Sequence, residues 1–219
     1  MAVDLRNEMV DLRRNLLAMG AMVEQRVTRV IEVMIDGDLQ LAEVVRAGEA
    51  EVDQMELDLE ATCMRLLALA QPVAGDLRLI LAVIRISNEL ERIADLARGI
   101  AKKLIKLGAA DGPPLPPAMI DLAFASRTML SDVLAAMSNE DASLCRQVRR
   151  ADQRVDDLHK EVLQWARQEI PRDVATSGQT IEMLTIAQRF ERIADMTTNI
   201  AEDVIFLVEG RIVRHARDA

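Results

Sequence analysis

The sequence is poor in aromatic residues. Only 2% of its 219 residues are aromatic, with no tyrosine and a single tryptophan, whereas half of all residues are apolar. Leucine, isoleucine, valine, methionine and alanine must therefore supply the core. This mixture suits interlocking helices better than a β-sandwich, whose strands are enriched in aromatic residues.

Cysteine is also scarce. The two cysteines, Cys63 and Cys145, lie far apart and show no pairing or metal-binding pattern. We expect both to be reduced, half-buried helix residues. A disulfide-stabilised fold and a cysteine-ligated metal are therefore not expected.

Long apolar runs and an excess of positive charge are likewise missing. The longest apolar run, residues 79–84, is closed by Arg78 and Arg85, far short of the roughly 20 residues of a membrane-spanning helix. The N-terminus lacks the apolar region of a signal peptide. The formal net charge of -9 argues against binding to nucleic acid or to an anionic membrane surface. We therefore expect a cytoplasmic protein that is not an integral membrane protein and binds no nucleic acid.

Few segments break the helical patterns. Proline, glycine and turn-forming residues gather at residues 36–38, 71–72, 108–117, 138–141 and 170–173. Six stretches with helical periodicity lie between these breaks, and none has the alternation of a strand. The proline-rich residues 113–117 are the only linker-like stretch, with three expected helices on each side.

An internal repeat relates the two halves. The pentapeptide ERIAD occurs at residues 91–95 and again at 191–195. Residues 80–107 and 180–207 align without a gap and share ten identities. The upstream sequences RAGEAEVD and RRADQRVD also resemble each other, at an offset of 103.

The repeat predicts a duplicated three-helix unit. Two copies are too few for a solenoid, which needs at least three repeats. We therefore predict an all-α fold of two tandem antiparallel three-helix bundles, one in residues 1–110 and one in residues 115–219.

The third and sixth expected helices carry apolar residues at alternating spacings of three and four. This stripe runs from Val83 to Leu107 in the third helix and from Met183 to Leu207 in the sixth. Such spacing is typical of the buried seam of a helical bundle or coiled coil.

Acidic residues four positions apart follow the seam on four of the expected helices. The pairs are Glu49 and Asp53, Glu91 and Asp95, Asp152 and Asp156, and Glu191 and Asp195. Residues four apart lie nearly above one another on a helix. Because each acid comes one position after a seam residue, the pairs turn away from the hydrophobic stripe. If the two helices in each half are neighbours, four carboxylates meet across the groove between them.

These pairs have two interpretations. A single pair of acids on a helix is usually part of a solvated face, which needs no ligand. Like charges four apart are mildly destabilising, however, and here they recur at equivalent places in both halves. Clustered carboxylates bind cations, and an all-oxygen cluster suits magnesium, calcium, manganese or iron better than structural zinc.

At these residues the sequence strongly resembles the PhoU family of phosphate-transport and phosphate-signalling regulators. Residues 66–101 resemble the first repeat of the family and read LLALAQPVAGDLRLILAVIRISNELERIADLARGIA. The second repeat and the C-terminal end are resembled by residues 191–216, which read ERIADMTTNIAEDVIFLVEGRIVRHA. The resemblance covers essentially the whole chain and implies two three-helix bundles.

The resemblance also implies metal sites and partners. It assigns all four acidic pairs to surface multinuclear metal sites, with iron or zinc as the metals reported and manganese or magnesium as further candidates. In this sequence Ala94 and Leu96, and again Ala194 and Met196, replace the glycine and histidine that family members often have. The implied function is negative regulation of phosphate uptake and of the phosphate-starvation two-component response. The implied partners are the ATPase subunit of the phosphate ABC transporter, the sensor histidine kinase and a second copy of the chain.

Two other functions are considered beside the regulatory adaptor. A di-metal enzyme of the ferritin-like kind needs Glu-xxx-His motifs in a bundle core, and the only histidines are His159 and His215. The alternative is a structural or dimerisation bundle whose acids bind no metal. Because the sequence has neither a glycine-rich phosphate loop nor a nucleophile–base pair, we predict that the protein is not an enzyme.

Overall fold

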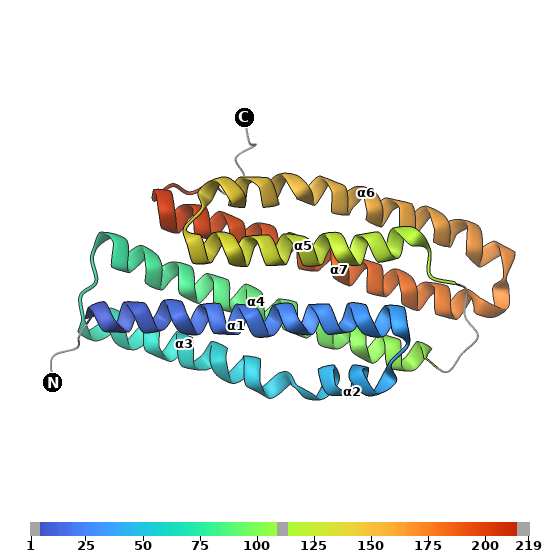
Figure 1. The fold of residues 1–219 in the computed structure, drawn as a ribbon, viewed down its shortest axis with the longest axis horizontal. Helices are drawn as coiled ribbons and strands as arrows, with labels where there is room; N and C mark the ends of the chain where they lie inside the picture. Colours follow the sequence, from blue (N-terminus) through green and yellow to red (C-terminus); the bar gives the residue numbers. More distant parts are fainter. Residues whose placement is uncertain (1–4, 109–113, 214–219) are drawn as a thin grey trace.

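The computed structural model describes residues 5–108 and 114–213, and within them the side chain of Glu49 is not described. All regular structure in these ranges is helical. The helices are α1 (Leu5–Asp36), α2 (Leu39–Ala47), α3 (Glu49–Leu69), α4 (Ala74–Leu107), α5 (Pro117–Asn139), α6 (Ala142–Arg172) and α7 (Ser177–Glu209), with a short 3-10 helix, η1 (Val174–Thr176), before α7. The helices run roughly along one long axis (Figure 1). The predicted all-α tandem bundle is confirmed.

The two halves repeat the same antiparallel arrangement. In the first, α1, the α2–α3 segment and α4 pack together, and in the second α5, α6 and α7 do so. The second helix of each half begins in the same way, because Asp38 and Asp141 each accept hydrogen bonds from two backbone N–H groups of the following turn. The first residue of the predicted linker (residues 113–117) lies outside the described residues, and residue 117 already begins α5.

One expected helix is broken. The sequence predicts one continuous helix between the breaks at residues 36–38 and 71–72, but the structure ends α2 at Ala47 and starts α3 at Glu49. Between them the carbonyl oxygen of Gly48 accepts a hydrogen bond from the guanidinium of Arg26, whose side chain is buried. Because this partner comes from α1, the pattern of residues 39–69 alone does not reveal the break. The corresponding helix of the second half, α6, is continuous.

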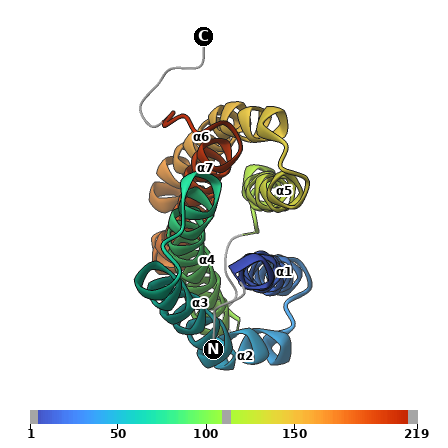
Figure 2. The same cartoon turned by 90° about the vertical axis from the view of Figure 1, so that its left-hand side faces the viewer.

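The halves share one hydrophobic core. The predicted stripes of α4 and α7 are buried as far as Leu104 and Val204, and Leu107 and Leu207 are partly buried at their ends. Helix α4 packs against α7, and α1 packs against α5. Viewed along the molecule, α1 and α5 lie on the same side of the α4–α7 pair (Figure 2). The bundles are therefore fused along α4 and α7.

Both cysteines are free and buried more deeply than expected. Cys63 and Cys145 are fully buried. Burial raises the pKa of Cys63 to about 11 and that of Cys145 to about 12, with a smaller contribution from a nearby acid in each case. Within residues 5–108 and 114–213, no helix is long and apolar enough to span a membrane.

An ion pair between a buried carboxylate and a partly exposed guanidinium joins α4 to α7. The Asp203 carboxylate is 2% exposed and lies 3.2 Å from a guanidinium nitrogen of Arg85. The same guanidinium lies over the ring of Phe206, 5.6 Å from its centroid. The partners come from opposite halves of the chain, so the pair stabilises the contact between the two bundles.

Replacing Asp203 with alanine is expected to lower the free energy of unfolding by about 1–3 kcal/mol, because Arg85 loses its carboxylate and a buried space is left. Urea denaturation followed by circular dichroism measures the change. Asp11→Ala is the control, since Asp11 pairs with Arg14 on the exposed surface of α1 and such pairs contribute little. Equal stability of the two variants would contradict a structural role for the Arg85–Asp203 pair.

Candidate functional site

Helices α3 and α4 bring acidic side chains together in the first half. Glu91 and Asp95, four apart on α4, share one flank of that helix, and Asp53 and Glu56 approach it from α3. Partial burial is the main cause of a raised pKa at Glu91, and the charges of Asp95, Glu56 and Asp53 raise it further. The neighbouring Arg92 has the opposite and smaller effect.

The second half contains the corresponding group on α6 and α7. Burial raises the pKa of Asp152 to about 6, with additional repulsion from Asp195 and Asp156, while a hydrogen bond with Thr198 opposes the rise. The pKa of Glu191 is raised by burial and then by Asp195, Asp156 and Asp152. The pKa of Asp195 is raised by burial and by Asp156. All four predicted acids therefore interact across the α6–α7 groove.

The structure places the predicted acids on facing flanks of neighbouring helices and modifies their predicted exposure. In the first half Asp53 of α3 lies near Glu91 and Asp95 of α4, whereas the side chain of Glu49 lies outside the described residues. Of the seven predicted acids whose side chains are described, Asp195 has the largest exposed fraction, although neighbouring atoms still partly desolvate its carboxyl group, and the others are half-buried. Their flanks lie at the rims of the closely packed α3–α4 and α6–α7 interfaces, so partial burial replaces the expected outward orientation.

Sequence reasoning missed two members of these groups. Glu56 and His159 occupy equivalent positions in the repeat, three residues after Asp53 and Asp156. His159 has a pKa lowered by burial, although the charge of Asp156 acts in the opposite direction. The spacing of three on the same flank could have identified both residues. The other histidine, His215, lies outside the described residues.

The acidic groups are not arranged around a single point. Within the described part of the chain, no three Asp, Glu, His or Cys side chains lie close enough to hold one metal ion. The groups do offer a suitable set of donors, since carboxylate oxygens are the ligands of hard cations and His159 adds a nitrogen in the second half. We refer below to Asp53, Glu56, Glu91 and Asp95 as the first acidic group, and to Asp152, Asp156, His159, Glu191 and Asp195 as the second.

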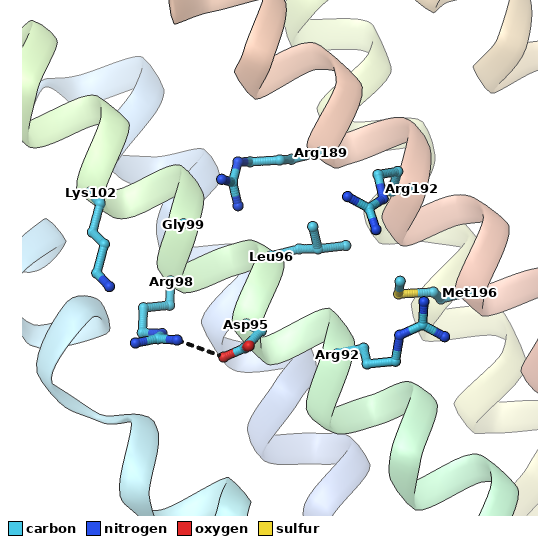
Figure 3. A pocket seen from close by; sticks show the side chains of 9 residues that line it. All are labelled: Arg92, Asp95, Leu96, Arg98, Gly99, Lys102, Arg189, Arg192 and Met196. Carbon is cyan, nitrogen blue, oxygen red and sulfur yellow. Dashed lines mark hydrogen bonds and ion pairs between the residues drawn. The ribbon is translucent and has the colours of Figure 1, made fainter.

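A basic cavity adjoins the first acidic group. It has a volume of about 370 Å³ and lies between α4 and α7. Its lining residues are Arg92, Asp95, Leu96, Arg98, Gly99, Lys102, Arg189, Arg192 and Met196 (Figure 3). Asp95 is its only acid and forms an ion pair of 3.0 Å with Arg98. Leu96 and Met196, two of the residues that depart from the family pattern, form apolar parts of its wall.

Comparison with known proteins identifies the family. The PhoU domain matches the chain twice, over residues 16–104 and 119–204. The chain belongs to the PhoU family. The two matches fall on α1–α4 and on α5–α7, so each bundle of the structure corresponds to one PhoU domain.

Curated PhoU proteins resemble the chain over nearly its whole length. It is 33% identical to the phosphate-specific transport system accessory protein PhoU of Serratia marcescens, covering 95% of this chain and 86% of that protein. The homologue from Pseudomonas aeruginosa is 34% identical, with the same coverage. The PhoU protein of Escherichia coli K12 is 31% identical.

Solved PhoU structures share the fold. The crystal structure of PhoU from Pseudomonas aeruginosa matches with a TM-score of 0.91 at 33% identity, covering 95% of this chain and all of that one. The phosphate transport system regulatory protein PhoU from Streptococcus pneumoniae matches with a TM-score of 0.86 at 26% identity, covering 96% of this chain and 99% of that one.

Proposed function

We propose that this protein is a non-catalytic regulatory adaptor of phosphate transport. The observation that carries the proposal is the match of both bundles to PhoU domains, together with the resemblance over 95% of the chain to phosphate-specific transport system accessory proteins. In detail, the adaptor is a cytoplasmic negative regulator of phosphate uptake and of the phosphate-starvation response. Its partners are the ATPase subunit of the phosphate ABC transporter and the sensor histidine kinase.

The two acidic groups are the proposed metal sites of this adaptor. Asp53, Glu91 and Asp95 hold metal in the first half, with Glu49 and Glu56 as additional donors. In the second half Asp152, Asp156, Glu191 and Asp195 do so, and His159 adds a nitrogen donor in its neutral form. A bound iron, zinc, manganese or magnesium ion supplies the positive charge that offsets repulsion between these carboxylates. The pKa values of Asp152 and Glu191 are raised mainly by burial and further by the neighbouring carboxylates, which supports the proposal because a cation would offset both penalties on the ionised acids.

Deleting the gene is expected to derepress phosphate-starvation genes while phosphate is plentiful, because the kinase loses its negative regulator. Transcript levels in the deletion strain, with and without a plasmid copy of the gene, measure the effect. Pull-down from phosphate-replete cells should recover the transporter ATPase and the sensor kinase. Unchanged transcripts in a strain without a second PhoU gene would reject the regulatory role.

The alternative function, a structural bundle without metal, predicts a different metal content of the purified protein. Protein purified without chelator and analysed for bound metal should contain iron, zinc, manganese or magnesium if the adaptor carries metal. Absence of metal at every loading condition would favour the structural bundle. Light scattering of the same sample tests the proposed homodimer.

A further inference from the structure

We propose that the basic cavity between α4 and α7 binds a small, multiply charged phosphate anion, of the size of a di- or triphosphate chain. Its volume of about 370 Å³ falls in the range of small-molecule sites and is larger than one phosphate group requires. The inference rests on the cavity itself and does not depend on the proposed adaptor role or on metal in the acidic groups.

The charges in the cavity are strongly unbalanced. Five of its nine lining residues are basic, and a single carboxylate, that of Asp95, opposes them. Arg98 pairs with that carboxylate, and Arg92 pairs at 3.3 Å with Glu89 outside the cavity. Among the described residues, Lys102, Arg189 and Arg192 form no salt bridge.

Arg189 is the central cation of the cavity. Its side chain reaches from α7 across to α4, toward Gly99 (Figure 3). A Cβ atom on Gly99 would lie 1.8 Å from a terminal nitrogen of Arg189, so the guanidinium occupies the space that any other residue would fill. The Nε of Arg189 is buried without a hydrogen-bond partner.

The residue equivalent to Arg189 in the first repeat carries the opposite charge. Position 89 corresponds to position 189, and it holds an acid, Glu89, that accepts hydrogen bonds from Arg92 and Asn199. The donors next to position 89, Arg92 and Asn199, therefore have an acidic partner. In the second repeat Arg189 replaces the acid, and a bound anion would supply the missing negative charge.

Phosphate is the anion that suits this geometry. A guanidinium donates two parallel hydrogen bonds to phosphate oxygens, and three arginines accompany Arg189 around the cavity. These cations come from two neighbouring helices, α4 and α7, and line one open cavity (Figure 3). An acidic peptide would carry its carboxylates along an extended chain and would require an elongated basic surface. Five cations around one cavity favour a compact anion of high charge density.

Isothermal titration calorimetry on the full chain tests the site, in buffer with chelator and at fixed ionic strength. Tripolyphosphate, orthophosphate, adenosine triphosphate and sulfate are titrated in turn. We expect tripolyphosphate to bind more tightly than sulfate. Arg189→Gln should weaken this binding at least about tenfold, because hydrogen bonds to a charged partner are lost.

Two further variants separate the site from general charge effects. Gly99→Leu fills the cavity without changing charge, keeps a good helix former in α4 and should also weaken binding about tenfold. Arg14→Gln, on the exposed surface of α1, makes the same charge change as Arg189→Gln and should leave affinity unchanged. Circular dichroism confirms that each variant is folded.

The ligands also distinguish the source of the phosphate. If tripolyphosphate binds with a dependence on Arg189 and adenosine triphosphate does not, the site is assigned to a free polyphosphate chain. If both bind with that dependence, the site also accepts a nucleotide. Either result supports the proposal. The proposal is overturned if orthophosphate binds more tightly than tripolyphosphate, if sulfate binds as tightly as every phosphate tested, or if Arg14→Gln weakens binding as much as Arg189→Gln.

Discussion

Replacing Phe190 with alanine is expected to lower the free energy of unfolding by about 3–5 kcal/mol. Phe190 is the largest of the fully buried side chains. It lies on the buried stripe of α7, the helix that packs against α4, α5 and α6. Truncation removes apolar surface from the shared core and leaves a cavity that the surrounding helices fill only in part. Urea denaturation, followed at 222 nm, measures the loss as a lower midpoint.

A second phenylalanine provides the matched control. Phe124 on α5 is 42% exposed, so Phe124→Ala removes the same atoms with much less loss of buried surface. Its midpoint should change far less than that of Phe190→Ala. If the phenylalanine variants lose stability equally, the α7 stripe is not the core of the fused bundles. Phe190→Leu gives an intermediate loss that remains measurable if the alanine variant does not fold.

The buried stripes of α4 and α7 were predicted correctly for a simple physical reason. Apolar residues at alternating spacings of three and four occupy one side of a helix, so the stripes of α4 and α7 could be identified from local sequence alone. The acid positions followed from the same helical geometry. Glu56 and His159 lie on the same flanks and were missed because the search used only a spacing of four.

Features that depend on distant residues could not be predicted in this way. The break at Gly48 requires Arg26, which approaches from another helix. The fusion of the two bundles depends on contacts between α4 and α7 that neither repeat contains by itself. The basic cavity arises because Arg189 crosses to Gly99, ninety positions earlier in the chain. The repeat even concealed it, since the equivalent residue of the first half is an acid.

Asp152→Asn is expected to stabilise metal-free protein at neutral pH. The pKa of Asp152 is raised to about 6 in the folded state, above the value of 3.8 for an unperturbed aspartate. The folded protein therefore binds the proton more tightly than the unfolded chain, so ionised Asp152 reduces stability. At 1.36 kcal/mol per pKa unit the reduction is at most about 3 kcal/mol. Asparagine removes the charge and, with it, this penalty.

The sign of the pH dependence follows from the same shift. For the chelator-treated wild type, the penalty is fully present above about pH 7 and decreases as the pH falls through 6 toward 4. The raised pKa values of Glu91, Glu191 and Asp195 act in the same direction. Asp152→Asn should therefore exceed the wild type in thermal stability at pH 7.5, and the difference should shrink by pH 4.5.

Asp157 is the control on the same helix, because its exposed carboxylate has a pKa lowered by a hydrogen bond with Lys160. Removing a favourable charge should not stabilise the protein, so Asp157→Asn should show no gain at pH 7.5.

Thermal stability in added manganese distinguishes the penalty of the ionised Asp152 from its role in metal binding. Manganese should stabilise the wild type more than Asp152→Asn, because the variant has lost a carboxylate ligand. A pH-independent difference between wild type and Asp152→Asn would exclude the ionisation of Asp152 as the cause, whereas an equal response to manganese would remove Asp152 from the proposed metal site.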